Sequence, residues 1–313
     1  MSFCLLSLVV PCYNEESCLR ALYASICQIL PSLPEGLEVE FRFVDDGSTD
    51  GTLSVLKELR SGDHRVHYQS FSRNFGKESA LLCGMEAARG DLVAVMDADM
   101  QDPPSMLLEM VSHVWSGEWE CVATRRMDRR GEPVIRSFFA RMFYGLMGWL
   151  TRVNLEPGAR DFRLMTRKYV NALLSMREYN RFSKGLFGWV GFKVKWLPYE
   201  NKERLSGESK WSFTGLCKYA LEGVIGFSTS PLYLSFVLGF LACLFAAIIC
   251  IKTLVKTLFF GEAVQGYTTI LACLTFFSGL QFLLIGVLGL YVSKIYMEVK
   301  GRPIYLVQES SDE

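Results

Sequence analysis

The chain has 313 residues and carries 33 acidic and 33 basic side chains, so its formal net charge is zero. A neutral chain argues against nucleic acid as a bulk partner, because binding to a phosphate backbone calls for excess positive charge. The length is enough for one α/β domain with further elements, and hydrophobic residues, which make up half of the chain, are most frequent near its C-terminal end.

The cysteine and histidine content narrows the chemistry further. None of the ten cysteines forms a Cys-X-X-Cys pair, and we expect them to be reduced and mostly buried, as in a cytosolic catalytic domain. The three histidines, His64, His67 and His113, give little support for a His-ligated zinc site or a Ser-His-Asp triad. The apolar first ten residues lack a preceding basic residue, so they predict a buried strand and not a signal peptide.

The first part of the chain alternates short apolar runs with helical patterns. The runs predict strands over Ser7–Pro11, Val39–Val44, Val66–Ser70, Leu92–Met96 and Cys121–Thr124. Helices are predicted from an Asn14 N-cap to about Leu30, after Thr52 to about Arg60, over Lys77–Ala88, and after Pro103 and Pro104. This alternation predicts an α/β fold with a mainly parallel sheet that has helices on both faces.

Polar side chains follow three of these strands, namely Tyr13 and Glu15, Asp45 and Asp46, and Asp97 and Asp99. Ligands of such sheets bind at the carboxyl ends of the strands, so we expect these residues to meet at one crevice. Asp97 and Asp99 are two residues apart, which aims both carboxylates the same way in extended chain, with the Gln101 amide one step beyond. Hard oxygen ligands of this kind suit Mg²⁺ or Mn²⁺, although a polar turn closing a core strand is the simpler alternative.

The sequence lacks two common phosphate-binding devices. It has no G-x-x-x-x-G-K-[ST] segment and no G-x-G-x-x-G segment after the first strand, so a nucleotide would be held through metal and side chains. A basic cluster follows the fifth strand and contains Arg125, Arg126, Arg129, Arg130 and Arg136. It is either a solvated loop or a phosphate-binding segment, since guanidinium groups match phosphate geometry.

Several segments of the second part of the chain point to a membrane. Apolar residues over 138–150 recur at helical spacing beside Arg136 and Arg141, which favours either a core helix or a helix on a membrane surface. Asp161 lies in a short apolar segment, Phe192–Leu197 predicts a strand, residues 203–211 a polar loop, and residues 213–224 an amphipathic helix.

Two stretches, 223–251 and 263–293, contain no charged residue. Each exceeds the roughly 20 apolar residues that a membrane-spanning helix needs, so the sequence predicts two transmembrane helices. More basic residues flank the pair (Lys210, Lys218, Lys294, Lys300 and Arg302) than lie between its helices (Lys252 and Lys256), which favours cytoplasmic ends. Glycines in the spans, at 239, 279, 286 and 289, would allow close helix packing in a homo-oligomer.

Five motifs together resemble one enzyme family across essentially the whole chain. They are Pro-Cys-Tyr-Asn-Glu at 11–15, Val-Asp-Asp-Gly-Ser-Thr-Asp-Gly-Thr at 44–52, Asp-Ala-Asp-Met-Gln at 97–101, Asp-Phe-Arg-Leu at 161–164 and Ser-Lys-Trp at 209–211. The chain is similar to the family-2, GT-A-fold glycosyltransferases, and most of all to those that act on polyprenyl phosphates. These include bactoprenol glucosyltransferases and dolichyl-phosphate mannose synthases, and the two C-terminal spans match the bactoprenol branch.

The resemblance assigns roles to residues of this sequence. It implies a nucleotide-binding set of Pro11, Tyr13, Glu15, Asp46, Asp97 and Ala98. It implies metal ligation by Asp97, Asp99 and Gln101, and a catalytic set of Asp161, Asp99 and Arg163. Donor or acceptor phosphates would be bound by Arg125, Arg126, Arg129, Arg136, Arg204, Ser209 and Lys210.

The implied activity is a metal-dependent, inverting hexosyl transfer from a UDP-sugar, with UDP-glucose first, to undecaprenyl phosphate for cell-envelope glycan modification. Because a phosphate monoester has a second pKa near ~6 and is already ionised at neutral pH, we expect Asp161 to orient Arg163 or the acceptor more than to remove a proton. Alternatives are an aminoarabinose derivative as donor, GDP-mannose with dolichyl phosphate, or an inactive sugar-nucleotide-binding scaffold. A processive synthase would need a Gln-x-x-Arg-Trp segment and more spans.

The resulting domain plan has three parts. Residues 1–211 form a cytosolic GT-A domain with an interface helix at about 136–150, residues 212–228 a juxtamembrane amphipathic helix, and residues 229–313 a two-helix transmembrane hairpin with a short cytosolic tail. This plan predicts a multi-pass protein of the inner (cytoplasmic) membrane, with the catalytic domain and both termini in the cytoplasm.

Overall fold

The computed structural model describes residues 5–126, 156, 158–199, 228–260 and 266–312. The chain divides into two compact units, one made of Met1–Leu216 with Arg302–Glu313 and the other of Cys217–Gly301. The expected interface helices at 136–150 and 212–228 lie outside the described residues.

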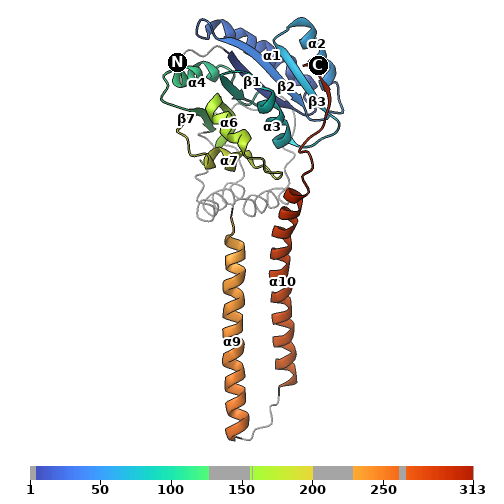
Figure 1. Ribbon diagram of the computed structural model, residues 1–313, viewed down its shortest axis with the longest axis vertical. Helices are drawn as coiled ribbons and strands as arrows, with labels where there is room; N and C mark the ends of the chain where they lie inside the picture. The colour runs from blue at the N-terminus through green and yellow to red at the C-terminus, as the bar shows by residue number, and fades with distance from the viewer. Residues whose placement is uncertain (1–4, 127–155, 157, 200–227, 261–265, 313) are drawn as a thin grey trace. The chain divides into compact units, whose positions relative to one another are not determined.

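The first unit is built on an eight-stranded sheet with the order β7-β5-β6-β4-β1-β2-β3-β8. Figure 1 shows β1, β2 and β3 lying side by side in this sheet. Its strands are β1 (Leu5–Cys12), β2 (Glu38–Asp45), β3 (Val66–Phe71), β4 (Leu92–Val95), β5 (Cys121–Arg126), β6 (Ala159–Thr166), β7 (Val194–Tyr199) and β8 (Val307–Ser310). Its helices are α1 (Glu16–Ile29), the 3₁₀ turn η1 (Leu30–Ser32), α2 (Thr52–Gly62), α3 (Lys77–Ala87), α4 (Met106–Trp115), α6 (Arg167–Ser175) and α7 (Ser183–Trp189).

The sheet is mixed, and the predicted α/β class is confirmed. β1 pairs in parallel with β2 and β4, β2 with β3, and β5 with β7. β6 runs antiparallel to β4 and β5, and β8 runs antiparallel to β3. Helical crossovers join the parallel strands β1 to β4, since parallel neighbours need such a connection and antiparallel neighbours do not.

The sheet is covered on both faces, as the near-continuous apolar runs of its central strands require. One face packs a core of residues such as Leu8, Phe41 and Phe162 against α1, α2 and α4. The other face carries α3, which lies on β1 and β2. A Cβ atom at Gly84 would lie 2.3 Å from Val9 Cγ1, so glycine at this position is what lets α3 approach the sheet.

The C-terminal segment contributes the last strand of this sheet. Sequence reasoning placed residues after 301 in a short tail of the hairpin, whereas in the structure they belong to the first unit and form β8. Tyr305 stacks on Phe71 with ring centroids 4.9 Å apart, and Lys57 Nζ lies 2.8 Å from the Glu309 carboxylate. The segment contains only a short apolar run, Ile304 to Val307, which the sequence analysis did not single out, and these tertiary contacts hold it in the sheet.

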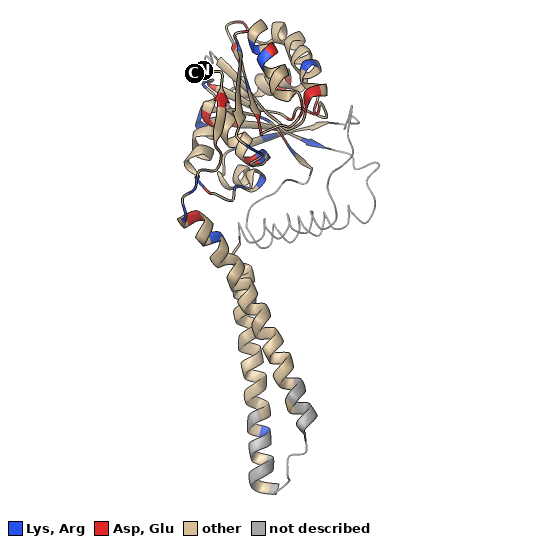
Figure 2. Ribbon diagram, turned by 90° about the vertical axis from the view of Figure 1, so that its right-hand side faces the viewer, with Lys and Arg blue, Asp and Glu red and all other residues tan. Residues whose placement is uncertain are grey.

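The second unit contains two long helices, α9 (Ser230–Phe260) and α10 (Tyr267–Val299), that contact one another. Ser230–Ile249 and Cys273–Val299 are long and apolar enough to cross a membrane. Their surfaces are uncharged along most of their length (Figure 2), and large side chains such as Phe236, Phe240 and Phe282 are exposed. Length and composition therefore agree with the two predicted spans.

Candidate active site

The loops that follow β1 and β2 are tied together by hydrogen bonds. Asn14 Oδ1 accepts from the Thr49 backbone N–H at 2.9 Å, and the Asn14 N–H donates to Ser48 Oγ at 2.9 Å. Asn14 has a φ of 56° and does not cap α1, whose N-cap is Glu15 without a side-chain cap bond. The predicted cap was therefore wrong, because the Asn14 amide serves the neighbouring loop. Two predicted nucleotide-binding loops are thereby joined.

The predicted nucleotide-binding residues lie at these neighbouring strand ends. Pro11 and Cys12 pair with Val44 and Asp45 in the β1–β2 ladder, and the Tyr13 side chain is 41% exposed. Asp46 is buried, and its carboxylate accepts from the backbone N–H groups of Phe75 at 2.7 Å and of Gly76 at 2.9 Å.

The sequence predicts that Asp46 accepts a hydrogen bond from a base or ribose. It did not indicate the contact with the backbone before α3 that the structure shows. Burial raises the pKa of Asp46, against the lowering effect of the two amides. The Asp46 carboxylate, which belongs to the predicted nucleotide-binding set, therefore fixes the backbone at the start of α3.

Asp97 and Asp161 face one another across the β4–β6 pair. Val95 is opposite Arg163 in this antiparallel ladder, so continuing the register by two residues brings Asp97 opposite Asp161. Between them lies Lys77, the first residue of α3, whose Nζ is 2.6 Å from Asp97 Oδ1 and 2.5 Å from Asp161 Oδ2. One ammonium group is therefore shared by two carboxylates, one that follows β4 and one on β6.

The pKa values of the two carboxylates that share Lys77 are shifted in opposite directions. Burial, together with the neighbouring Asp161 carboxylate, raises the pKa of Asp97 despite Lys77. Burial also acts to raise the pKa of Asp161, but the ammonium groups of Lys77 and Lys184 outweigh it and hold that pKa below its ordinary value. Lys77 itself has a raised pKa, because the two carboxylates outweigh its partial burial, so it is charged at neutral pH.

The loop after β4 holds Asp99 and Gln101. Asp99 Oδ1 accepts from the Gln101 N–H at 3.1 Å, which closes a tight turn around Met100, whose φ is 55°. The Gln101 amide oxygen accepts from Arg160 Nη2 at 2.7 Å. The expected metal ligand Gln101 is thus engaged by a guanidinium.

Arg160 also binds the buried Asp102, which accepts from the Tyr199 hydroxyl. Arg160 on β6 therefore fixes the loop that carries Asp99.

The donor set around Asp97 fits a divalent cation. Asp97 Oδ1 is buried and, although Lys77 lies 2.6 Å away, the geometry there is not that of a hydrogen bond, so the oxygen lacks a well-aligned donor. No group of three or more His, Cys, Asp or Glu side chains in the described ranges is placed to hold a metal. Mg²⁺ characteristically takes one or two carboxylates and completes its shell with waters and substrate phosphates, so Asp97 and Asp99 suffice for such a site.

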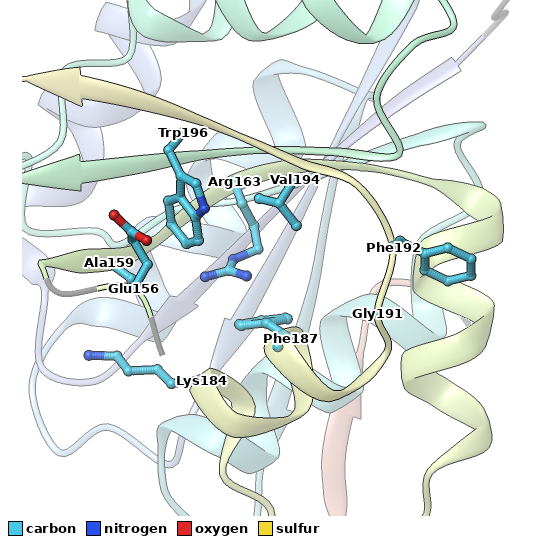
Figure 3. Close-up of a pocket in the computed structure, with 10 residues that line it drawn as sticks. Glu156, Ala159, Arg163, Lys184, Phe187, Gly191, Phe192, Val194 and Trp196 are labelled. Carbon is cyan, nitrogen blue, oxygen red and sulfur yellow. The ribbon is translucent and has the colours of Figure 1, made fainter. Parts of the chain in front are cut away.

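A cavity of about 290 Å³ lies on the same face of the sheet, next to β6 and α7. Arg163 and Lys184 line it together with the aromatic rings of Phe187 and Trp196 (Figure 3). The Arg163 side chain is buried, lies 3.4 Å from the centre of the Phe187 ring and donates to the Arg160 carbonyl at 2.9 Å.

The expected pairing of Asp161 with Arg163 is not what the structure shows. Arg163 Nε donates to the Asp161 backbone carbonyl, whereas the Asp161 carboxylate binds Lys77. Both side chains nevertheless lie on one face of β6, because they are two residues apart on a strand.

The predicted phosphate-binding residues are only partly described. Arg125 Nη1 lies 2.6 Å from the Glu156 carboxylate, so its guanidinium is held by an acid in this structure. Arg126 is the last residue of β5. Ala98, which belongs to the predicted nucleotide-binding set, is buried next to Asp97. The remaining predicted members, Arg129, Arg136, Arg204, Ser209 and Lys210, lie outside the described residues.

Sequence reasoning missed Lys77, Arg160, Asp102 and Lys184. Lys77 is 84 residues from Asp161, and it reaches the site because α3 lies on β1 and β2, which no local pattern reveals. A signal was present for Arg160, since it directly precedes the motif that begins at Asp161.

Comparison with known proteins gives relatives that span nearly the whole chain. The Bacillus subtilis protein CsbB is 42% identical over 307 residues, which is 98% of this chain and 92% of that protein. The prophage SfII-derived bactoprenol glucosyl transferase of Shigella flexneri is 38% identical over 312 residues, 97% of this chain and 98% of its own length. Among solved structures, glucosyl-3-phosphoglycerate synthase from Mycobacterium tuberculosis is a remote likeness, with 20% identity, a TM-score of 0.48, and coverage of 71% of this chain and 77% of that one.

A family model covers most of the described sheet. The model described as Glycosyl transferase family 2 matches residues 7–174, from β1 through the helix α6 that follows Asp161 and Arg163. The matched region contains the strand-end loops, the Asp97–Asp99 turn and β6, and the full-length relatives agree with it. This chain belongs to glycosyl transferase family 2.

Proposed function

We propose that this protein transfers a sugar from a nucleotide-sugar donor to a polyprenyl phosphate, with UDP-glucose and undecaprenyl phosphate as the preferred pair. The observation that carries the proposal is the combination of a family 2 catalytic unit with two helices of membrane-spanning length in one chain. Relatives named bactoprenol glucosyl transferases, 36–38% identical over 97% of this chain, support the lipid acceptor.

The site supports an inverting displacement. An oxygen of the lipid phosphate attacks the anomeric carbon and forms a new C–O bond, while the bond from that carbon to the nucleoside diphosphate breaks and its electron pair leaves with the diphosphate. Since a phosphate monoester is largely ionised above its second pKa of about 6, the attacking oxygen needs no proton removed at neutral pH. Asp161 then positions the reacting groups through Lys77.

Charge is distributed in the site as this reaction requires. Arg163 and Lys184 place positive charge beside Asp161, which suits an anionic acceptor. Asp97 and Asp99 offer carboxylates on the other side, where the donor diphosphate would bring Mg²⁺ or Mn²⁺. A bound divalent cation would stabilise the negative charge that develops on the leaving diphosphate.

The proposed cellular placement is the inner (cytoplasmic) membrane, with the catalytic unit and both termini in the cytoplasm. The basic residues that flank the two spans support this orientation under the positive-inside rule. The product, a polyprenyl-phosphate sugar, would serve cell-envelope glycan modification.

A panel of donors and acceptors tests the proposal. The purified full chain in detergent is supplied with UDP-glucose, other UDP-sugars or GDP-mannose, and with undecaprenyl or dolichyl phosphate, with and without Mn²⁺. We expect labelled glucose in the lipid fraction with UDP-glucose, undecaprenyl phosphate and metal. Transfer only from GDP-mannose or an aminoarabinose derivative would replace the donor assignment, and no lipid product from any pair would indicate a binding scaffold.

A further inference from the structure

The start of α3 connects several parts of the site. Gly76, with a φ of 99°, is the N-cap of α3 and donates its N–H to Asp46, so the expected nucleotide side sets the backbone just before Lys77. Glu78, the next residue, accepts from the Ser183 N–H at 3.0 Å and from the Ser183 hydroxyl. Lys77 is thus held between the donor side and α7, which lines the cavity.

The Lys77 ammonium lies against the carboxylate oxygen that a metal ion would need. It lies 2.6 Å from Asp97 Oδ1, the buried oxygen that has no well-aligned hydrogen-bond donor. A divalent cation on that oxygen would meet the ammonium at close range, where two like charges in a partly buried site repel strongly. The Lys77 side chain is still 43% exposed, so it has room to turn away while keeping its second partner, Asp161.

We propose that Lys77 is a positioning residue that bridges Asp97 and Asp161 in the donor-free protein. The divalent cation that arrives with the donor then replaces the Lys77 ammonium at Asp97. This inference rests on the proposed function, because it takes the donor to be a nucleoside diphosphate sugar that carries a cation.

Two consequences follow from the exchange of cations. The donor-free site is kept from binding divalent cations tightly, so the metal enters mainly together with the diphosphate, whose oxygens offset the cost of displacing Lys77. Once displaced, the ammonium remains with Asp161, on the acceptor side. Binding of the donor therefore breaks the Lys77 bridge between Asp97 and Asp161 before the acceptor phosphate reacts.

Mn²⁺ binding to the full chain in detergent, without donor or acceptor, tests this inference directly. Free Mn²⁺ is measured by electron paramagnetic resonance for the wild type, Lys77→Gln and Lys77→Arg. We expect Lys77→Gln to bind Mn²⁺ about tenfold more tightly, because a competing charge at contact distance is removed, and Lys77→Arg to stay near the wild type. A role in fold maintenance alone would weaken Mn²⁺ binding in Lys77→Gln.

Matched controls separate the local effect from general charge. Lys57→Gln makes the same charge change at an exposed ion pair with Glu309, outside the site, and should change the Mn²⁺ affinity by less than about twofold, since solvent and salt screen it. If Lys77→Gln does not fold, Lys77→Gln/Asp161→Asn removes one charge of each sign and is compared with Asp161→Asn. The double variant should bind Mn²⁺ more tightly than Asp161→Asn.

The inference is overturned if Lys77→Gln, or the double variant against its parent, binds Mn²⁺ no more tightly, including the case in which none of them binds it. The proposed function fails separately. A wild type that transfers no sugar to any lipid phosphate, but gains Mn²⁺ affinity on loss of Lys77, would contradict the function and keep the cation exchange.

Discussion

The β4–β6 pair and the β2–β3–β8 edge belong to one sheet, and both contain charged side chains with little exposure. At the edge, the Glu40 carboxylate accepts from Ser7 Oγ, from the Arg89 N–H and from the Arg42 guanidinium. Arg42 in turn binds Asp312 of the C-terminal segment. Each oxygen of Glu40 therefore has an aligned donor.

The β4–β6 pair differs because one buried carboxylate oxygen there, Asp97 Oδ1, lacks such a donor. Asp97 and Asp161 share the single ammonium of Lys77, and Asp97 Oδ1 is buried without an aligned donor. Removing one partner of a buried, fully hydrogen-bonded charge pair is destabilising, whereas a buried carboxylate oxygen without an aligned donor leaves a place for a cation. From this comparison we expect the edge to contribute mainly to stability and the strand pair to contribute mainly to catalysis.

Asp97→Asn should produce the largest effect. The substitution keeps the size of the side chain and removes the charge that would face the cation and the donor diphosphate, so we expect the transfer rate to fall by about 10³-fold. The temperature of thermal unfolding should change little, because the ion pair between Lys77 and Asp161 remains. Rate measurements at saturating donor, with unfolding followed in parallel, check both parts.

Glu40→Gln should have the opposite profile. Removing one partner of the buried Glu40–Arg42 pair should lower the free energy of unfolding by about 3 kcal/mol, while the transfer rate per folded molecule stays near the wild type. A large loss of rate without loss of stability would reverse the roles assigned to the two regions.

The same pair predicts a pH dependence of stability. Burial acts to raise the pKa of Glu40, but its bonds to Arg42, Ser7 and Arg89 outweigh burial and hold that pKa below its ordinary value of 4.5. The contribution of Glu40 is therefore present above pH 4.5 and is lost as the pH falls through the lowered pKa. Denaturation of the wild type and Glu40→Gln at a series of pH values should show their difference shrinking in acid.

Asp161→Asn should have an intermediate effect on catalysis. If Asp161 positions groups through Lys77, the rate should fall by about 10- to 100-fold and should not recover with rising pH, because the acceptor phosphate is already ionised above about pH 6. Rates from about pH 6 to 8.5 decide this point. Full recovery at the upper end would make proton removal the main role of Asp161.

Tyr305→Leu should have the smallest effect. It removes the stacking of Tyr305 on Phe71 and the hydroxyl contact with Glu86, which together anchor the segment before β8. We expect a loss of about 1 kcal/mol in the free energy of unfolding and an unchanged rate. Faster proteolysis after residue 300 would accompany it, and an unaltered cleavage pattern would argue against β8 depending on this contact.

Much of the fold was predictable because it depends on local pattern. The apolar runs at β1 to β5 mark the strands, and the acids that follow β2 and β4 mark the edge where ligands bind. Family motifs then singled out Asp161 and Arg163. Each of these signals lies within a few residues of the element that it predicts.

The features that could not be predicted depend on distant contacts. Lys77 and Asp161 are brought together by the packing of α3 on β1 and β2, and β8 exists through pairing with β3 and contacts from Lys57, Arg42 and Phe71. Asn14 fits a helix cap by residue type, yet the neighbouring loop offered its amide a partner. In each case a tertiary contact outweighed or replaced the local preference.

The most direct measurement follows labelled glucose from UDP-glucose into undecaprenyl phosphate, in the presence of Mn²⁺, for equal amounts of folded wild type, Glu40→Gln and Asp97→Asn. We predict lipid-linked glucose from the wild type and Glu40→Gln, and almost none from Asp97→Asn. Equal transfer by Asp97→Asn and the wild type would contradict the assignment of the β4–β6 carboxylates to chemistry.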